Sequence, residues 1–369
     1  MKFQKINLGL FFLFSITLSI GQTPLFEKNK CIIISEENKP TAYVDTIFKG
    51  KPSLKLDSKN QSIAITKGLG VKNFKVDMDI AGEVMAGLGF RVASEKNYQF
   101  IYFRPQLGGT QEAIQYIPIY NGALSWVFYN YPTYETRADI ERLEWFHATI
   151  EVRGTHLKVF VDHNTEPQMD VTLLDNELSG GNLLLRSMFG TSYFANVTYE
   201  PLTDTTSVPP AINKKDFLRK WDISQQFPRD TVTGYFDNAV HKAHTSNEWR
   251  SIHDPKDNFM NFSKYFEYPN GLLVARTNIS SKGDKEINLH FDFVGKLRIL
   301  LNDEEVFNYQ RIRFERMFDG TFRVRLHLQK GENTLIFVSE GDAAFFGEGF
   351  KTMGRFQHTN WGYIARLGN

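Results

Sequence analysis

The sequence predicts an all-β protein built of two β-sandwiches in tandem. Short runs in which apolar and polar residues alternate recur along the whole chain, and this is the period-2 pattern of half-buried strands. Gly, Asn or Asp punctuates the junctions, while helical periodicity is weak everywhere except around Lys214 to Lys220. A stretch rich in Pro, Thr and Ser divides the 369 residues, which suffice for about two domains.

The N-terminus has the pattern of a secretory signal peptide. Lys2 and Lys5 precede an apolar stretch from Leu8 to Ile20 that is too short to span a bilayer comfortably, and the small Gly21 follows it. We expect residues 1–21 to be removed and the mature protein to be exported, to the periplasm or to the extracellular medium. An uncleaved membrane anchor is the alternative. No later stretch is apolar enough to predict a transmembrane helix, so no membrane span is expected after cleavage.

Charge and cysteine content exclude two classes of interaction. The formal net charge of +1 becomes about −1 once Lys2 and Lys5 leave, which gives no electrostatic basis for binding nucleic acid. Cys31 is the only cysteine, so no intramolecular disulfide forms, and its CIII context predicts a strand residue. An aromatic content of 14% fits broad sheet faces and leaves rings available for stacking.

The chain divides at Pro201 to Lys215, a segment without apolar periodicity that contains a Pro-Pro pair. We predict a first sandwich over residues 22–200, a linker over 201–215 and a second sandwich over 216–369. The strand-like runs of the first are 73–80, 88–94, 99–106, 148–154, 156–163 and 182–187, and those of the second are 296–303, 322–328 and 333–339.

One passage of the first sandwich carries a family resemblance. Trp145 and His147 open a strand, Gly154 lies in the turn of a hairpin, Val161–Asp162 ends it, and a G-x-L-x-L…F-x-N-V-x-Y pattern closes the region at 181–199. This resembles the concanavalin A-like jelly rolls, including laminin-G-like modules and the 3-keto-disaccharide hydrolase-like family. The resemblance covers residues 26–199 and implies the fold, which hosts lectins, hydrolases and adhesion modules alike.

The second sandwich resembles the galactose-binding-like jelly rolls attached to many glycoside hydrolases. The passages that carry this resemblance are 297–310, with an Asn-Asp turn between two strands, and 323–341, with a K-G-E-N turn. The resemblance implies that Lys220–Phe227 and Asn360–Asn369 are paired terminal strands. Five arginines between Arg311 and Arg325 flank a turn at Asp319, and we expect them to be solvated on an exposed strand face.

Large amphipathic side chains gather in residues 91–126 of the first sandwich. Strand alternation puts Tyr102, Arg104 and Gln106 on one face, which we expect to form a concave groove. Tyr and Trp rings stack on the C–H faces of sugars, while Arg and Gln hydrogen-bond to their hydroxyls. The predicted ligand-binding residues are Arg91, Tyr102, Arg104, Gln106, Gln115, Tyr116, Tyr120 and Trp126.

The favoured function is therefore recognition of a carbohydrate by an exported protein. Arg91 with Arg104 leaves room for an acidic or sulfated sugar, because guanidinium groups pair well with carboxylates and sulfates. One alternative is a glycoside hydrolase or related sugar-active enzyme that uses carboxylates in the same groove. The other is an adhesion or assembly module without a small ligand, in which the tyrosine-rich face is buried by another protein or by the second sandwich.

The sequence identifies no catalytic residue. Glycoside hydrolysis usually needs two facing carboxyl groups, and Glu112 and Glu135 lie in loops beside the predicted groove. Laminarinase-like members of the superfamily use an E-x-D-x-E strand. Here the corresponding spacing gives Asp77, Asp79 and Ala81, so the third acid is missing and a solvated face is the simpler interpretation.

No cofactor or metal site is predicted. His241, His244 and His253 lie close together in sequence, but no carboxylate stands where a zinc hydrolase motif requires one. Loop carboxylates such as Asp237 could bind calcium, although no D-x-D-x-D-G loop occurs. The sequence also contains no nucleophile elbow, phosphate loop or dinucleotide fingerprint.

Overall fold

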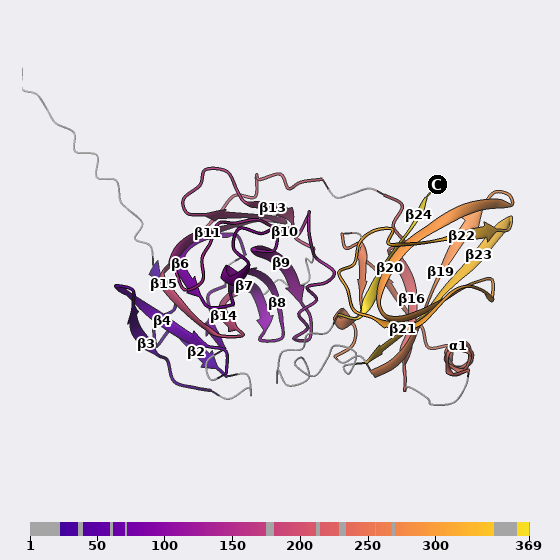
Figure 1. Ribbon diagram of the computed structural model, residues 1–369, viewed down its shortest axis with the longest axis horizontal. Helices are drawn as coiled ribbons and strands as arrows, with labels where there is room; N and C mark the ends of the chain where they lie inside the picture. Colours follow the sequence, from indigo (N-terminus) through magenta and orange to yellow (C-terminus); the bar gives the residue numbers. More distant parts are fainter. Residues whose placement is uncertain are drawn as a thin grey trace, which may run out of the picture.

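The protein is all-β, as predicted, with two strand-built bodies that lie side by side in Figure 1. The computed structural model describes residues 23–35, 40–59, 62–70, 72–174, 181–211, 215–228, 234–254, 256–267, 270–342 and 360–368. The expected signal peptide, 1–21, lies outside this range. Among the described residues, no helix is long and apolar enough to cross a membrane.

The first body consists of two antiparallel sheets that pack face to face. Sheet A has the order β13-β12-β11-β6-β15-β4-β3, with β1 added beside β15, and sheet B has the order β10-β9-β8-β7-β14-β5-β2. The strands of sheet A are β1 (Thr23–Pro24), β3 (Asp45–Phe48), β4 (Lys51–Asp57), β6 (Phe74–Gly82), β11 (Phe146–Arg153), β12 (His156–Val161), β13 (Met169–Thr172) and β15 (Thr191–Pro201). Those of sheet B are β2 (Cys31–Ile34), β5 (Ile63–Thr66), β7 (Met85–Ser94), β8 (Asn97–Phe103), β9 (Ile114–Ile119), β10 (Glu135–Thr136) and β14 (Asn182–Met188).

Alternation along the strands decides which side chains fill the space between sheets A and B. Phe74 of β6 meets Phe90 of β7 with ring centroids 5.7 Å apart, and Phe103 of β8 meets Phe146 of β11 at 5.2 Å. The predicted hairpin around Gly154 is confirmed as β11 and β12, which pair antiparallel from Ala148 to Arg153. Residues between these on the same strands point to the outer faces of the sandwich.

The second body is one nine-stranded curved sheet, sheet C, with the order β17-β16-β19-β23-β20-β24-β18 and with β21 and β22 both paired to the long β20. Its strands are β16 (Lys220–Phe227), β17 (Arg250–His253), β18 (Phe259–Asn261), β19 (Asn270–Ser281), β20 (Lys285–Leu301), β21 (Glu304–Arg313), β22 (Phe322–Leu328), β23 (Gly331–Asp342) and β24 (Gly362–Gly368). The two expected turns are confirmed: Asn302–Asp303 joins the paired strands β20 and β21, and Gly331 lies where the chain passes from β22 to β23, each of which pairs with β20.

The predicted pairing of the terminal strands of this body is wrong. β16 pairs with β17 and β19, whereas β24 pairs with β18 and β20. The longest strand, β20, occupies the place beside β24, and only an isolated bridge from Phe217 to Arg366 joins the two ends. The domain limits 22–200, 201–215 and 216–369 stay a prediction, although sheets A and B end at Pro201 and sheet C begins at Lys220.

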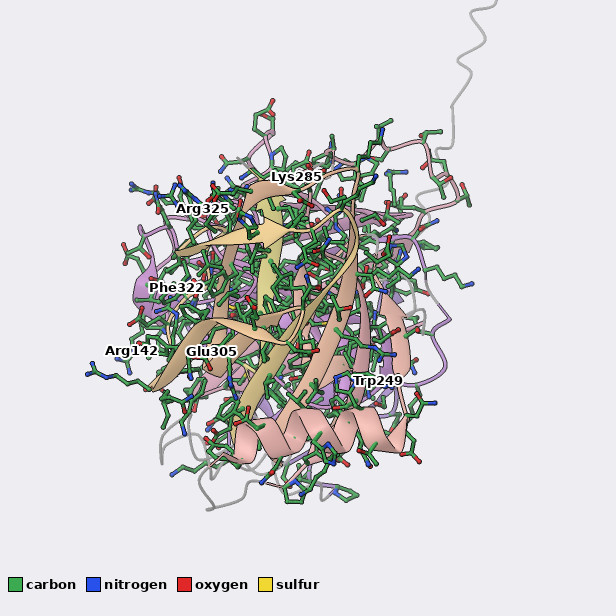
Figure 2. The ribbon with its side chains drawn as sticks, turned by 90° about the vertical axis from the view of Figure 1, so that its right-hand side faces the viewer. Arg142, Trp249, Lys285, Glu305, Phe322 and Arg325 are labelled. Atoms are coloured by element: carbon green, nitrogen blue, oxygen red, sulfur yellow. The ribbon has the colours of Figure 1, made fainter. Side chains whose placement is uncertain are left out.

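The helix lies elsewhere than the weak helical pattern suggested. No helix forms in described residues 215–220, and the α-helix α1 spans Tyr235–Ser246. It buries Phe236, Ala239 and Ala243, spaced three and four residues apart, against β19 and β23. Figure 2 shows α1 running across the lower ends of the strands of sheet C, near Trp249. Short 3-10 turns occur at η1 (Pro105–Leu107) and η2 (Phe262–Lys264).

Candidate functional site

Most of the predicted ligand-binding residues lie inside the protein rather than on an open face. Six of the eight are buried, and only Gln106 is exposed and Trp126 half-buried. Tyr116 points between the sheets, where its hydroxyl donates to Gln99 Oε1 at 2.6 Å and accepts from the Leu174 amide at 3.1 Å. Fully buried side chains offer no surface to a ligand. The glycan-contact role of this set stays a prediction, and the open common groove that we expected for it is not observed.

Three of these residues leave the expected face for local backbone reasons. β8 ends at Phe103, and the ring of Pro105 starts the η1 turn, so Gln106 does not continue the strand alternation. Arg91 lies at an irregularity of the β7–β8 pairing with a φ of 50°, and its guanidinium donates to the Gly154 carbonyl. Tyr120 follows the end of β9, where the Lys264 ammonium lies 5.5 Å from its ring centroid.

The remaining four come together on the outer face of sheet B. The Tyr102 hydroxyl donates to Gln115 Oε1, and the Gln115 amide donates to the carbonyls of Trp126, at 2.9 Å, and Tyr129. The segment 121–134, which follows β9, therefore covers this face. Burial raises the pKa of Tyr102 above its usual range, which keeps its hydroxyl protonated as a donor.

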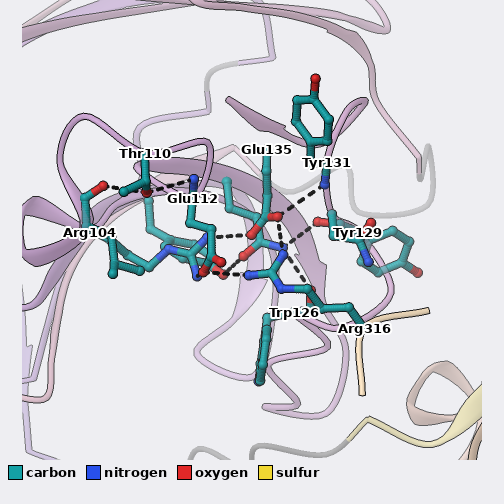
Figure 3. A network of polar contacts seen from close by, with 12 residues as sticks. Arg104, Thr110, Glu112, Trp126, Tyr129, Tyr131, Glu135 and Arg316 are labelled. Carbon is teal, nitrogen blue, oxygen red and sulfur yellow. Dashed lines mark hydrogen bonds and ion pairs between the residues drawn. The ribbon is translucent and has the colours of Figure 1, made fainter. Parts of the chain in front are cut away.

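A four-membered ion-pair network lies beside these residues (Figure 3). Arg104 pairs with Glu135, whose second oxygen pairs with Arg316 and accepts from the Tyr131 amide at 3.1 Å. Arg316 also pairs with Glu112 at 2.7 Å, and Arg104 lies 3.5 Å from the same oxygen of Glu112. The network joins the two bodies, because Arg316 comes from the segment between β21 and β22.

Glu112 and Glu135, the two acids that we expected beside the groove as candidates for glycoside hydrolysis, are both engaged in this network. Both oxygens of the buried Glu135 face guanidinium groups, and Glu112 is held by the same two arginines. Sequence reasoning placed both acids beside the groove but assigned Arg316 to a solvated face. Its guanidinium lies 5.2 Å from the ring centroid of Trp126. Arg313, which we also expected to be solvated, is 8% exposed and pairs with Asp292 at 2.8 Å. No local sequence signal distinguishes these two arginines from the exposed ones.

An open cleft lies next to this network, between the two bodies. It has a volume of about 400 Å³, and the segment 128–134 forms one wall. Tyr131, 44% exposed, and Phe318, 47% exposed, line it from opposite bodies. The peptide bond between Tyr131 and Pro132 is cis. Residues of the predicted linker, Pro210 and Lys215, also line the cleft. Sequence reasoning missed both aromatic residues, since each lies in a turn without strand periodicity.

Polar side chains are fixed around this cleft. The Asn130 amide donates to the Met317 carbonyl at 3.1 Å, which ties the two walls together. Asp319 accepts from Lys215 at 2.7 Å and from Arg366 at 2.6 Å. Asn258 accepts from Arg219 at 3.0 Å and lines the cleft. The four charged residues of the lining are Asp170, Lys215, Lys256 and Asp319, two of each sign, so the cleft has no excess of either charge.

The described residues contain no group of three or more His, Cys, Asp or Glu side chains placed to hold a metal ion. His241 and His244 lie on α1, and His253 lies on the edge strand β17. All three side chains are exposed. Asp237 pairs with Arg298 in the first turn of α1. Calcium binding through loop carboxylates stays a prediction.

No family model and no curated protein matches the chain. Solved structures with a similar arrangement include the carbohydrate binding module CBM66 from Bacillus subtilis, at 18% identity and a TM-score of 0.33, covering 43% of this chain and 91% of that one. Domain 4 of AbnA, a GH43 extracellular arabinanase from Geobacillus stearothermophilus in complex with arabinotriose, matches at 14% identity and a TM-score of 0.32, over 47% and 82% of the two chains.

A protein of unknown function with a galectin-like fold from Bacillus subtilis matches at 8% identity and a TM-score of 0.33, over 50% of this chain and 96% of that one. The matched structures thus include carbohydrate-binding modules, a galectin-like protein and domains of glycosyl hydrolases.

Proposed function

We propose that the protein recognises a carbohydrate in the cleft between its two bodies. The observation that carries this proposal is the pair of rings, Tyr131 and Phe318, that line one cleft from opposite sides while each remains nearly half exposed. Exposed apolar surface that gathers at one site, rather than lying scattered, is typical of ligand-binding grooves, and aromatic rings suit the C–H faces of sugars. Polar side chains fixed beside them, such as Asn258, provide directional contacts for hydroxyl groups.

The cleft suits a neutral glycan better than an acidic one. Its lining has two acidic and two basic residues, and Asp319 and Lys215 neutralise one another at 2.7 Å. The acidic or sulfated sugar that Arg91 and Arg104 suggested loses support, because each guanidinium has protein acceptors. Binding of a neutral sugar would then depend on stacking and hydrogen bonds and would change little with salt.

An assembly module without a small ligand is the second candidate. The observation that favours it is the contact of the second body with segment 121–134, which itself covers the tyrosine-rich face from within the first body. The Tyr129 hydroxyl donates to Asp257 of the second body at 2.7 Å, and Asn261 donates to Ser125 at 3.1 Å. These contacts give the tyrosines a structural role, whereas the cleft rings Tyr131 and Phe318 remain open.

A glycan array on the protein from Gln22 onward, run with and without calcium, tests the proposal. We expect binding of neutral glycans that survives both calcium removal and added salt. Every positive glycan is then incubated with the protein and examined for cleavage products, which would revive the hydrolase alternative. An array without any positive glycan contradicts carbohydrate recognition and favours the assembly module. Export, to the periplasm or the medium, belongs to the same proposal, and N-terminal sequencing of the secreted protein checks it.

A further inference from the structure

A second, larger groove lies on the outer face of sheet A. Its volume is about 790 Å³, within the range of roughly 300–1,000 Å³ common for ligand pockets. Strands β6, β11 and β15 supply Asp77, His147 and Asn196 to its lining, and the N-terminal segment around Phe26 closes one side. No lining residue is shared with the cleft between the bodies.

Asp79 lies beneath the groove and fixes the polar side chains His147 and Asn196 of its lining. Its carboxylate accepts from His147 Nδ1 at 2.8 Å, from the Lys51 ammonium at 2.7 Å and from the Asn196 amide at 2.7 Å. Burial raises the pKa of Asp79, but the hydrogen bonds from these three side chains outweigh it and leave the pKa below its usual value. Asp79 is therefore an ionised anchor, and the side chains around it are oriented before any ligand arrives.

The orientation of His147 matters for binding. Because Nδ1 faces the Asp79 carboxylate, Nε2 is directed toward Thr149 Oγ1, at 3.5 Å, and Asp77 Oδ1, at 3.6 Å. The imidazole stacks on that of His163 with ring centroids 4.1 Å apart. The floor thus offers hydrogen-bonding groups of several kinds beside flat rings, which matches the alternating hydroxyl and C–H surfaces of a sugar.

The charges of the groove are nearly balanced and favour an uncharged ligand. Its lining contains the acids Glu27, Asp45 and Asp77 and one lysine, Lys75, which pairs with Asp77 at 3.2 Å. Beneath them, Asp79 is balanced by Lys51. Lys30 pairs with Glu27 at 3.0 Å, so four carboxylates face three ammonium groups, and an acidic ligand finds no cationic excess.

We propose that this groove is a second ligand site, for an uncharged polyhydroxylated ligand such as a neutral oligosaccharide. Asp77, His147 and Asn196 contact the ligand, and Asp79 is a positioning residue. The proposal goes beyond the function assigned to the cleft and stands on different residues. If both sites bind glycan, the chain is bivalent, and its avidity for a polysaccharide exceeds the affinity of either site.

The test follows the histidine ring signals of the full-length mature protein by NMR, with ¹⁵N-labelled histidine. The probes are malto-, cello-, xylo-, arabino- and fructo-oligosaccharides, with oligogalacturonate as the acidic comparison. We expect at least one neutral probe, and not oligogalacturonate, to shift the His147 signals in a saturable way. If no neutral probe does so, or if oligogalacturonate does so equally, the proposal is wrong.

Matched variants separate this site from the cleft. Asn196 has a φ of 51°, so Asn196→Gly removes the amide without straining the backbone. We expect it to weaken binding about tenfold, the loss typical of one or two hydrogen bonds. Asn247→Gly, at an exposed position with a φ of 49°, is the control and leaves binding unchanged.

Variants of the cleft between the bodies show whether the groove on sheet A and the cleft bind independently. Tyr131→Ala and Phe318→Ala leave the His147 shifts intact if the groove binds independently. Loss of those shifts in the cleft variants, or equal affinities for Asn196→Gly and Asn247→Gly, would overturn the second site. If the wild type and the cleft variants bind with the same affinity and stoichiometry while the His147 shifts persist, the groove is the site and the cleft proposal is contradicted.

Discussion

At the scale of single residues, Asp257 stands out as a carboxyl group buried where the two bodies meet. It is 6% exposed and accepts from the Tyr129 hydroxyl at 2.7 Å and from the Phe259 amide at 2.8 Å. Burial, and then the negative charge of Asp254, raise the pKa of Asp257 to about 7. Hydrogen bonds from Tyr129 and Phe259 lower it, but by less.

This carboxyl group predicts how stability depends on pH. An acid whose pKa is raised in the folded state stabilises the fold when protonated, and that stability is lost as pH rises from about 4 to about 7. We expect the melting temperature of Asp257→Asn to vary less over this interval than that of the wild type, as measured by calorimetry. Asp139→Asn is the control, because its side chain is 79% exposed. Parallel profiles for Asp257→Asn and the wild type would contradict the assignment.

Residue-scale prediction from sequence succeeded for strand faces and failed for solvent exposure. Alternation correctly placed Asp77 and Asp79 together on the face of β6 opposite its apolar residues. The solvated face that we expected there is wrong for Asp79, which is 7% exposed and accepts from three side chains. It could not show that segment 121–134 folds back over Tyr102, because that contact depends on where a loop goes after β9. The polar groups of Gln115, expected to face a sugar, instead satisfy carbonyls of that loop.

At the scale of elements, β7 depends on a glycine at position 87, where the paired backbone of β8 lies very close. A Cβ added at Gly87 would lie 2.2 Å from the Ile101 carbonyl oxygen and 2.7 Å from Tyr102 Cα, both backbone atoms. We therefore expect Gly87→Ala to lower the free energy of unfolding by about 1–3 kcal/mol. Urea denaturation measures the change. The control is Gly283→Ala, because no atom lies within 4 Å of a Cβ added there, and it should change the free energy of unfolding by no more than about 0.5 kcal/mol. Equal losses in the two variants would contradict the close approach of β8 to Gly87.

The segment between β21 and β22 acts as a connector because it carries Arg316 into the first body. Arg316→Met leaves one oxygen of the fully buried Glu135 carboxylate without its guanidinium partner. We expect a loss of about 1–3 kcal/mol in the free energy of unfolding. Arg325→Met, whose side chain is 71% exposed, should cost about 1 kcal/mol at most. The connecting role is wrong if the two variants denature at the same urea concentration.

Element prediction from sequence worked where local periodicity sets the structure. The β11–β12 hairpin and the turns at Asn302–Asp303 and Gly331 follow from short-range pattern and turn chemistry. The pairing of β16 and β24 was wrong because it was inferred from fold resemblance, and sheet order depends on long-range packing. Helix α1 did carry a signal, the apolar positions Phe236, Ala239 and Ala243, which the neighbouring histidines obscured.

At the scale of the whole molecule, the two bodies are joined both covalently and by a polar interface. Asn121 donates to the Ser263 carbonyl at 2.9 Å, and Asn261 donates to Ser125 at 3.1 Å, in addition to the contacts of Tyr129 and Arg316. Within the expected linker, residues 202–211 form no strand or helix and Val208 is 84% exposed, so we expect proteases to reach this part of the chain.

Limited proteolysis therefore tests the predicted domain limits. We expect the first cleavage within 201–215. The two fragments should still elute together from a size-exclusion column, because the noncovalent contacts between the bodies hold them together after the chain is cut. Fragments that separate at neutral pH and moderate salt would show that the interface does not hold the bodies together. First cleavage elsewhere in the described chain would contradict the domain limits.

The cleft between the bodies is the central claim, and calorimetric titration of the variant Tyr131→Ala/Phe318→Ala tests it most directly. The ligand is the strongest neutral glycan from the array, and Ile312→Ala is the control, because Ile312 is 51% exposed and does not line the cleft. Loss of two stacking contacts should weaken binding at the cleft at least about tenfold, while the control matches the wild type. Unchanged affinity and stoichiometry in the double variant would contradict carbohydrate recognition in the cleft.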